Sequence, residues 1–145
     1  MGYGIGFVLA LVVAAFARLA GLDRDRAFYP TVLIVVASYY VLFAVMGGSP
    51  RALAGELMVM GLFVALAVGG FKWGSWVVAA GLAGHGIFDF VHASVVSNPG
   101  VPEFWPAFCG TYDVTAGVLL AYISRDVRGY LPRGLSSTFE FRALL

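Results

Sequence analysis

The sequence predicts an all-α fold, a polytopic membrane helix bundle of five transmembrane helices with its N-terminus outside and its C-terminus in the cytoplasm. Three observations lead to this prediction. Of the 145 residues, 61% are hydrophobic, and the mean hydropathy is +0.90. Only 12% are charged, half of the roughly 25% that a soluble domain carries. The charged residues also gather in a few short segments, which leave long apolar stretches between them.

Each apolar stretch is close to the roughly 20 residues that a helix needs to cross the hydrocarbon core. The stretches cover residues 1–17, 27–50, 52–71, 73–96 and 106–124. We expect residues 1–124 to form one five-helix transmembrane domain and residues 125–145 to form a cytoplasmic tail that contains arginines. The first stretch also resembles a signal peptide with a small-residue site at Ala15 and Ala17. No positive charge precedes it, so we expect it to be retained as a span.

Turn-forming residues separate the spans. A charged segment follows the first span, a Gly-Gly-Ser-Pro run follows the second, and a Ser-Asn-Pro-Gly-Val-Pro run follows the fourth. Glycine and proline stop helices, and irregular backbone in contact with lipid would leave peptide groups without hydrogen bonds. The breaks are therefore expected at the membrane surfaces, where aromatic residues form an interfacial belt. The aromatics that flank them are Phe28, Tyr29, Trp73, Trp76, Phe104 and Trp105.

The positive charges predict the orientation. With five spans, the two sides of the membrane receive very different numbers of Lys and Arg residues. One side has only Arg51, and the other has Arg18, Arg24, Arg26, Lys72, Arg125, Arg128, Arg133 and Arg142. Cytoplasmic connections carry the excess of positive charge, so the second side is expected to face the cytoplasm. We expect a multi-pass protein of the cell membrane, which in a bacterium is the inner membrane.

Ionisable residues lie inside the apolar stretches, although each costs about 2.5–3.5 kcal/mol to insert at the centre of a span. They are Glu56, His85, Asp89, His92 and Asp113. Counted at about 1.5 Å per residue from the outer ends of their spans, nearly all lie in the outer half of the membrane. Scattered polar residues would not converge in this way, so we expect a polar site near the outer face.

The fourth span carries the densest group, His85, Asp89 and His92, in the pattern H-x3-D-x2-H. Spacings of four and three residues place these side chains on one face of a helix. Imidazole and carboxylate ligands suit Zn²⁺ or Fe²⁺. We therefore predict a divalent metal site with His85, Asp89, His92 and Asp113 as its candidate ligands.

One ion bound by both histidines is difficult to build, because His85 and His92 are about 10.5 Å apart along the helix axis. A single histidine with Asp89, completed by Asp113 or Glu56, is simpler. The remaining histidine can then act as an acid or base, and His92 and Glu56 are the candidate catalytic residues. The structural alternative is that Asp89 pairs with the imidazoles of its own helix and that the polar groups only lock the helices together.

Other polar residues are expected to be structural. Cys109 and Asp113 are four residues apart and share a helix face. A buried free cysteine is usually a small hydrophobe, so Cys109 is not among the predicted ligands. Tyr39 and Tyr40 lie in the outer half of the second span and are expected to be interfacial.

Small residues and one stiff loop are expected to hold the site together. Glycines allow close approach of membrane helices, and those of the fourth and fifth spans would bring Asp113 to His85 and Asp89. The glycines are Gly81, Gly84, Gly110 and Gly117. The proline-rich loop 97–106 is expected to lie over the site, as a tight connection or as a lid.

Composition and spacing exclude several classes of function. Nine Lys and Arg residues against eight Asp and Glu residues leave a net charge of +1, and no basic stripe for nucleic acid is present. The single lysine, Lys72, lies at an interface and not mid-span, which excludes a retinal Schiff base. Histidines on one helix face cannot bind opposite sides of a haem, and no glycine-rich phosphate loop is present for a nucleotide.

Four segments resemble a family of small uncharacterised bacterial integral membrane proteins. They are residues 26–30 (RAFYP), 37–44 (ASYYVLFA), 85–92 (HGIFDFVH) and 106–109 (PAFC) with Asp113. This resemblance implies a membrane location and no particular activity. The His and Asp residues are also weakly similar to the intramembrane zinc hydrolases of the alkaline ceramidase and progestin/adiponectin receptor type. Those proteins use three histidines on seven helices, whereas this chain has two histidines and five predicted helices.

The sequence leaves three functional hypotheses. The first is a metal-binding membrane protein. As an enzyme, it would hydrolyse a lipid-like substrate that arrives through the bilayer. The second is a component of proton- or ion-coupled transport that uses the same carboxylates and imidazoles. The third is an accessory subunit that assembles into a homo-oligomer or a membrane complex.

Overall fold

The computed structural model describes residues 1–129, and side chains as far as Arg125. It confirms an all-helical fold, with five helices that are long and apolar enough to cross a membrane within the described residues. These are α1 (Gly2–Ala20), α2 (Phe28–Met46), α3 (Pro50–Trp73), α4 (Ser75–Val95) and α5 (Trp105–Gly129), with a short 3₁₀ helix η1 (Leu22–Arg24) after α1. The predicted tail from residue 130 onward lies outside the described residues.

Glycines and one serine set the helix boundaries. Gly21, with φ of 75°, ends α1 in the left-handed conformation, and Gly74, with φ of 135°, separates α3 from α4. At the start of α3 the Ser49 side chain accepts a hydrogen bond from the Ala52 backbone N–H at 3.2 Å. The predicted fifth span, residues 106–124, agrees closely with the apolar part of α5 at Trp105–Arg125, and the helix itself continues to Gly129.

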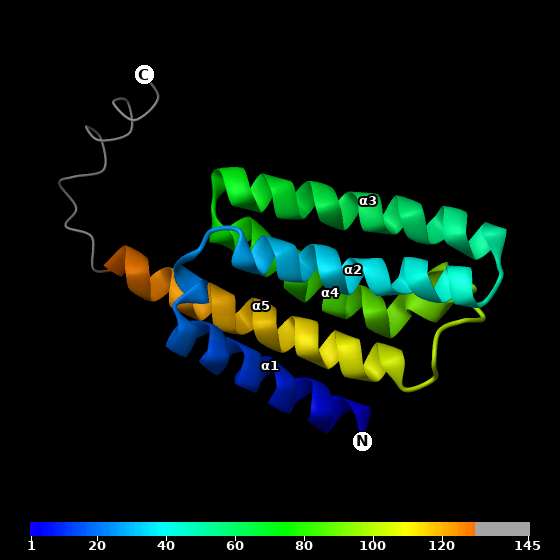
Figure 1. Ribbon diagram of the computed structural model, residues 1–145, viewed down its shortest axis with the longest axis horizontal. Coiled ribbons are helices and arrows are strands. Elements are labelled where there is room, and N and C mark those ends of the chain that lie inside the picture. The colour runs from blue at the N-terminus through cyan, green and yellow to red at the C-terminus, as the bar shows by residue number, and fades with distance from the viewer. Residues whose placement is uncertain (130–145) are drawn as a thin grey trace.

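The helices alternate in direction, as five consecutive spans require. The α1–α2 and α3–α4 connections lie at one end of the bundle with the C-terminal end of α5 (Figure 1). The N-terminus, the α2–α3 connection and the α4–α5 loop lie at the other end (Figure 1). We call the first the basic end, because Arg18, Lys72 and Arg125 lie there, and the second the site end.

Close helix packing positions the site between α4 and α5. In Figure 1, α5 lies between α1 and α4. A Cβ added at Gly86 would lie 2.6 Å from the Gly110 carbonyl oxygen, and one at Gly110 would lie 2.9 Å from the Gly86 oxygen. The prediction for Gly84 is wrong, because nothing lies within 4 Å of a Cβ built there. Gly81 packs against Leu33 of α2 and not against α5.

The bundle places its large apolar side chains outside and its ionisable side chains inside. Phe7, Leu62 and Ile87 are 48–62% exposed. In contrast, the five ionisable residues of the spans are only 0–2% exposed; they are Glu56, His85, Asp89, His92 and Asp113. This distribution suits a chain surrounded by lipid, where apolar surface is stable and charge is not.

Candidate metal centre

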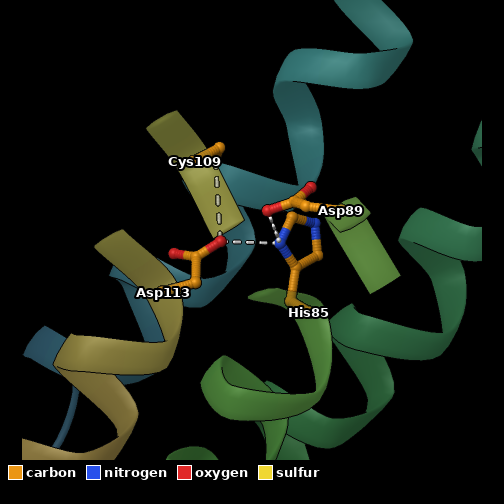
Figure 2. Close-up of side chains that lie close together, drawn as sticks. All are labelled: His85, Asp89, Cys109 and Asp113. Atoms are coloured by element: carbon orange, nitrogen blue, oxygen red, sulfur yellow. Dashed lines mark hydrogen bonds and ion pairs between the residues drawn. The ribbon is translucent and has the colours of Figure 1, made fainter. Parts of the chain in front are cut away.

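Four side chains of α4 and α5 converge at one point between the two helices (Figure 2). This inner group consists of His85, Asp89, Cys109 and Asp113. The His85 Nδ1 atom lies 2.7 Å from the Asp113 Oδ2 atom and 3.7 Å from the Asp89 Oδ2 atom. The Cys109 Sγ–H donates to the same Asp113 oxygen at 3.6 Å. All four residues are 0–2% exposed.

The inner group has the composition and size of a metal site. One nitrogen, one sulfur and two carboxylate oxygens, one atom from each residue, lie within 4.8 Å of one another. Zinc ligands lie about 2.0–2.3 Å from the ion, so small side-chain shifts would bring all four atoms to bonding distance. The spacing of four residues within each helix places two ligands on α4 and two on α5, on the faces that meet.

Most of the carboxylate oxygens of the inner group lack a hydrogen-bond donor. Both oxygens of Asp89 and Oδ1 of Asp113 are buried without a partner in the described part of the chain. Asp113 Oδ2 accepts from His85 and Cys109. Because Asp89 Oδ2 lies 3.7 Å from the same His85 nitrogen, two carboxylates share one imidazole. Buried acceptors and buried negative charge are costly unless a cation or a proton balances them. A bound divalent cation would supply that balance.

A second polar cluster lies nearer the site end of the bundle. This outer group consists of Tyr40 of α2, Glu56 of α3, His92 of α4 and Asn98 of the α4–α5 loop. His92 Nε2 donates to Glu56 Oε1 at 2.7 Å, and Asn98 Nδ2 donates to the same oxygen at 2.8 Å. Asn98 Nδ2 also donates to the Tyr40 backbone oxygen at 3.0 Å. The outer group thus ties three helices and the loop together.

Aromatic rings pack against the histidines of both groups. The Tyr40 ring stacks on the His92 ring with centroids 4.0 Å apart, and it lies 6.2 Å from the His85 ring. The edge-on ring of Phe63 is 4.6 Å from His85. The Tyr40 hydroxyl and Glu56 Oε2 are buried without a hydrogen-bond partner among the described residues.

The structure brings together three of the four candidate metal ligands, His85, Asp89 and Asp113. The fourth, His92, is directed away from them and pairs with Glu56 of α3. It lies seven residues beyond His85, about 10.5 Å further along the helix axis, where Glu56 of α3 is its partner. The two candidate catalytic residues, His92 and Glu56, are therefore bonded to each other in the outer group.

Three residues of the two groups were not assigned to the site from the sequence. The expectation that Cys109 is only a small hydrophobe is too restrictive, because its thiol contacts Asp113. The shared helix face of these two residues was the available signal. Tyr40 is 2% exposed and lies inside the bundle instead of at an interface. Asn98 gave no signal, since a loop asparagine usually only forms a turn.

Comparison of the chain with protein-family models, curated proteins and solved structures finds no match. The resemblance to small bacterial membrane proteins therefore remains an expectation. Function has to be inferred from the chemistry of the two polar groups and from their position in the bundle.

Proposed function

We propose that this protein is an integral membrane metalloprotein that binds one divalent transition-metal ion at the inner group, His85, Asp89, Cys109 and Asp113. The observation that carries the proposal is the set of buried carboxylate oxygens without hydrogen-bond donors, next to an imidazole and a thiol. A divalent ion bound there would neutralise both carboxylates in a region of low dielectric constant, where separate charges are costly.

The donor set favours Zn²⁺ or Fe²⁺ over Mg²⁺ or Ca²⁺. Imidazole and thiolate are borderline to soft ligands, whereas the alkaline-earth ions prefer sites made only of oxygen. The small number of protein ligands also fits a tetrahedral ion. The His85–Asp113 hydrogen bond would be replaced by bonds from both side chains to the ion.

Elemental analysis of the detergent-purified protein tests this proposal. We expect about one equivalent of Zn or Fe in the wild type and none in the double variant His85→Ala/Asp89→Ala, because half of the ligand set is removed. Glu56→Gln is the matched control, since it changes a buried carboxylate of the outer group, and it should retain the metal. A wild type without metal, or a double variant that keeps it, would contradict the proposal.

Hydrolysis of a lipid-like substrate would require a water molecule on the ion and a catalytic acid or base. His85, Asp89 and Asp113 alone would leave a coordination position for water if Cys109 remained protonated. The His92–Glu56 pair is the available acid/base system. However, all of these side chains are at most 2% exposed, so the geometry supports ion binding more strongly than substrate turnover.

Proton handling is the second candidate, because the two groups form a chain of ionisable side chains. Glu56 and His92 of the outer group reach Tyr40, and the Tyr40 hydroxyl lies near Asp89 of the inner group. In the described residues, no buried carboxylate or imidazole continues this chain toward the basic end. A complete conduit is therefore less well supported than a metal site.

A flux measurement in liposomes separates these two functions. We expect a pH gradient to decay across liposomes with the wild-type protein no faster than across protein-free liposomes, because half of the path is apolar. Faster decay that disappears in Asp89→Asn would favour proton transport over a metal site.

We also propose that the basic end faces the cytoplasm and the site end faces the outside, since Arg and Lys gather at cytoplasmic connections. Cysteine labelling with an impermeant maleimide tests this orientation. Ser97→Cys at the site end should react in intact cells, and Lys72→Cys at the basic end should react only after permeabilisation. The wild type, whose only cysteine is the buried Cys109, is the unlabelled control. The reverse labelling pattern would invert the orientation.

A further inference from the structure

The basic end of the bundle contains a cavity that neither polar group uses. Its volume is about 650 Å³, and residues of all five helices and of η1 line it. It extends from the charged turn Arg18–Arg26 to apolar walls at Val78 and Leu120. Because helices begin and end around it, the cavity lies at the depth of lipid headgroups in a bilayer that the five helices span.

Charged side chains of both signs line this cavity. The positive ones are Arg18, Arg24 and Arg26, and the negative ones are Asp23 and Asp25. Arg18 pairs with Asp23 at 3.4 Å, and Arg26 donates to the Phe71 carbonyl oxygen at 3.0 Å. Within the described residues, the Arg24 guanidinium makes no such contact. The cavity therefore offers positive charge to a ligand without being uniformly basic.

Two residues that line the cavity each carry a buried polar atom without a hydrogen-bond partner in the part of the chain that the structure describes. The Tyr29 hydroxyl is one, on a residue that is only 6% exposed, and the Asp23 Oδ1 atom is the other. A buried polar group without a partner is costly. One of these atoms donates and the other accepts, so a matching ligand must carry both an acceptor and a donor.

We propose that this cavity binds the headgroup of a phospholipid whose phosphodiester is followed by a hydrogen-bond donor, with phosphatidylethanolamine as the best fit. The phosphate oxygens would accept from the Tyr29 hydroxyl and the Arg24 guanidinium. The ammonium group would donate to Asp23 Oδ1. The apolar walls at Val78 and Leu120 would contact the start of the acyl chains. This inference is independent of the proposed metal site.

The acidic residues distinguish a lipid headgroup from free phosphate. Asp23 and Asp25 would repel a phosphate dianion, whereas a phosphodiester carries a single negative charge and its ethanolamine offsets Asp23. Phosphatidylcholine has the same phosphodiester but no N–H donor, so it would leave Asp23 Oδ1 without a partner. Free phosphate, phosphatidylcholine and phosphatidylethanolamine are therefore expected to bind the same protein with different affinities.

Native mass spectrometry of the full chain tests the proposal, with equal amounts of phosphatidylethanolamine and phosphatidylcholine that have identical acyl chains. We expect about tenfold preference for phosphatidylethanolamine, the size of one hydrogen bond to a charged group. Asp23→Asn should remove this preference. Tyr29→Phe, which deletes only the hydroxyl, should weaken binding of both lipids. Tyr122→Phe changes an exposed tyrosine of α5 and should leave binding unchanged.

Three results would overturn the proposal. The first is equal retention of the two lipids by the wild type, and the second is unchanged lipid binding in Tyr29→Phe. The third is displacement of bound lipid by inorganic phosphate at millimolar concentration, which would identify a site for the free anion instead. Thermal unfolding of the same samples in detergent shows that each variant is folded, and this control holds whether or not the inner group binds a metal.

Discussion

Replacing Asp89 by asparagine is expected to stabilise the metal-free protein and to abolish its stabilisation by Zn²⁺. In the absence of a metal, neither buried oxygen of Asp89 has a hydrogen-bond donor among the described residues, and Oδ2 lies 3.7 Å from an imidazole nitrogen that already bonds Asp113. Asparagine has nearly the same shape, carries no charge and supplies an N–H₂ donor to the remaining carboxylate. The cost of a second buried negative charge is thereby removed.

Metal should stabilise the wild type much more than Asp89→Asn. An ion that binds only the folded state stabilises it by about 2.7 kcal/mol when its free concentration is about 100-fold above the Kd. The wild type should gain this stability, and Asp89→Asn should gain almost none because it lacks a charged ligand. Thermal unfolding in detergent, with a chelator and then with Zn²⁺, measures both effects.

The control for this experiment is Glu56→Gln, which removes a buried carboxylate of the outer group. Glu56 Oε1 accepts from both His92 and Asn98, so its replacement should lower stability with and without metal by similar amounts. Equal stabilisation of the wild type and Asp89→Asn by Zn²⁺ would show that Asp89 is not a ligand. A loss of stability in metal-free Asp89→Asn would show that its carboxylate is already balanced.

Gly86→Ala is expected to lower both the thermal stability and the metal affinity of the protein. The added Cβ would lie 2.6 Å from the Gly110 oxygen and 2.8 Å from the Val114 backbone nitrogen. Backbone atoms cannot rotate away as side chains do, so α4 and α5 must separate. Overpacking of this kind costs about 1–3 kcal/mol, and the separation would also pull apart ligands that come from the two helices.

Gly84→Ala is the matched control, on the same helix and two residues away. A Cβ there has nothing within 4 Å, so we expect unchanged metal binding and unchanged or slightly higher stability, since alanine is the better helix former. Melting curves and metal titrations of both variants measure the difference. Equal effects of the two substitutions would show that close approach of α4 and α5 is not what forms the site.

The sequence predicts the five helices well because a lipid environment imposes strong local rules. Every span must be long, apolar and internally hydrogen-bonded, so the charged segment 18–26, the Gly-Gly-Ser-Pro run at residues 47–50 and Lys72 mark breaks without knowledge of the packing. The end of α5 lies beyond the predicted span for a simple reason. Charge ends a membrane span, but it does not end a helix, and α5 continues past Arg125.

The convergence of His85, Asp89 and Asp113 also follows from local information, namely helical spacing and a common depth. The contacts that His92, Tyr40 and Asn98 make with one another do not follow from local information. They depend on the rotation of each helix about its axis, which is set by contacts such as Gly86 against Gly110 between distant parts of the chain. A one-dimensional pattern gives the face of a helix that is polar, but not the neighbour that this face meets.

By itself the amino-acid sequence determined that this protein is a bundle of apolar helices with ionisable groups buried toward one end. Only the tertiary structure decided that these groups divide into an inner set with unbalanced carboxylates and an outer set in which Glu56 is bonded to His92. The physical reason is that insertion cost depends on the composition of each span, whereas charge balance depends on which side chains from different helices come within a few ångströms of one another.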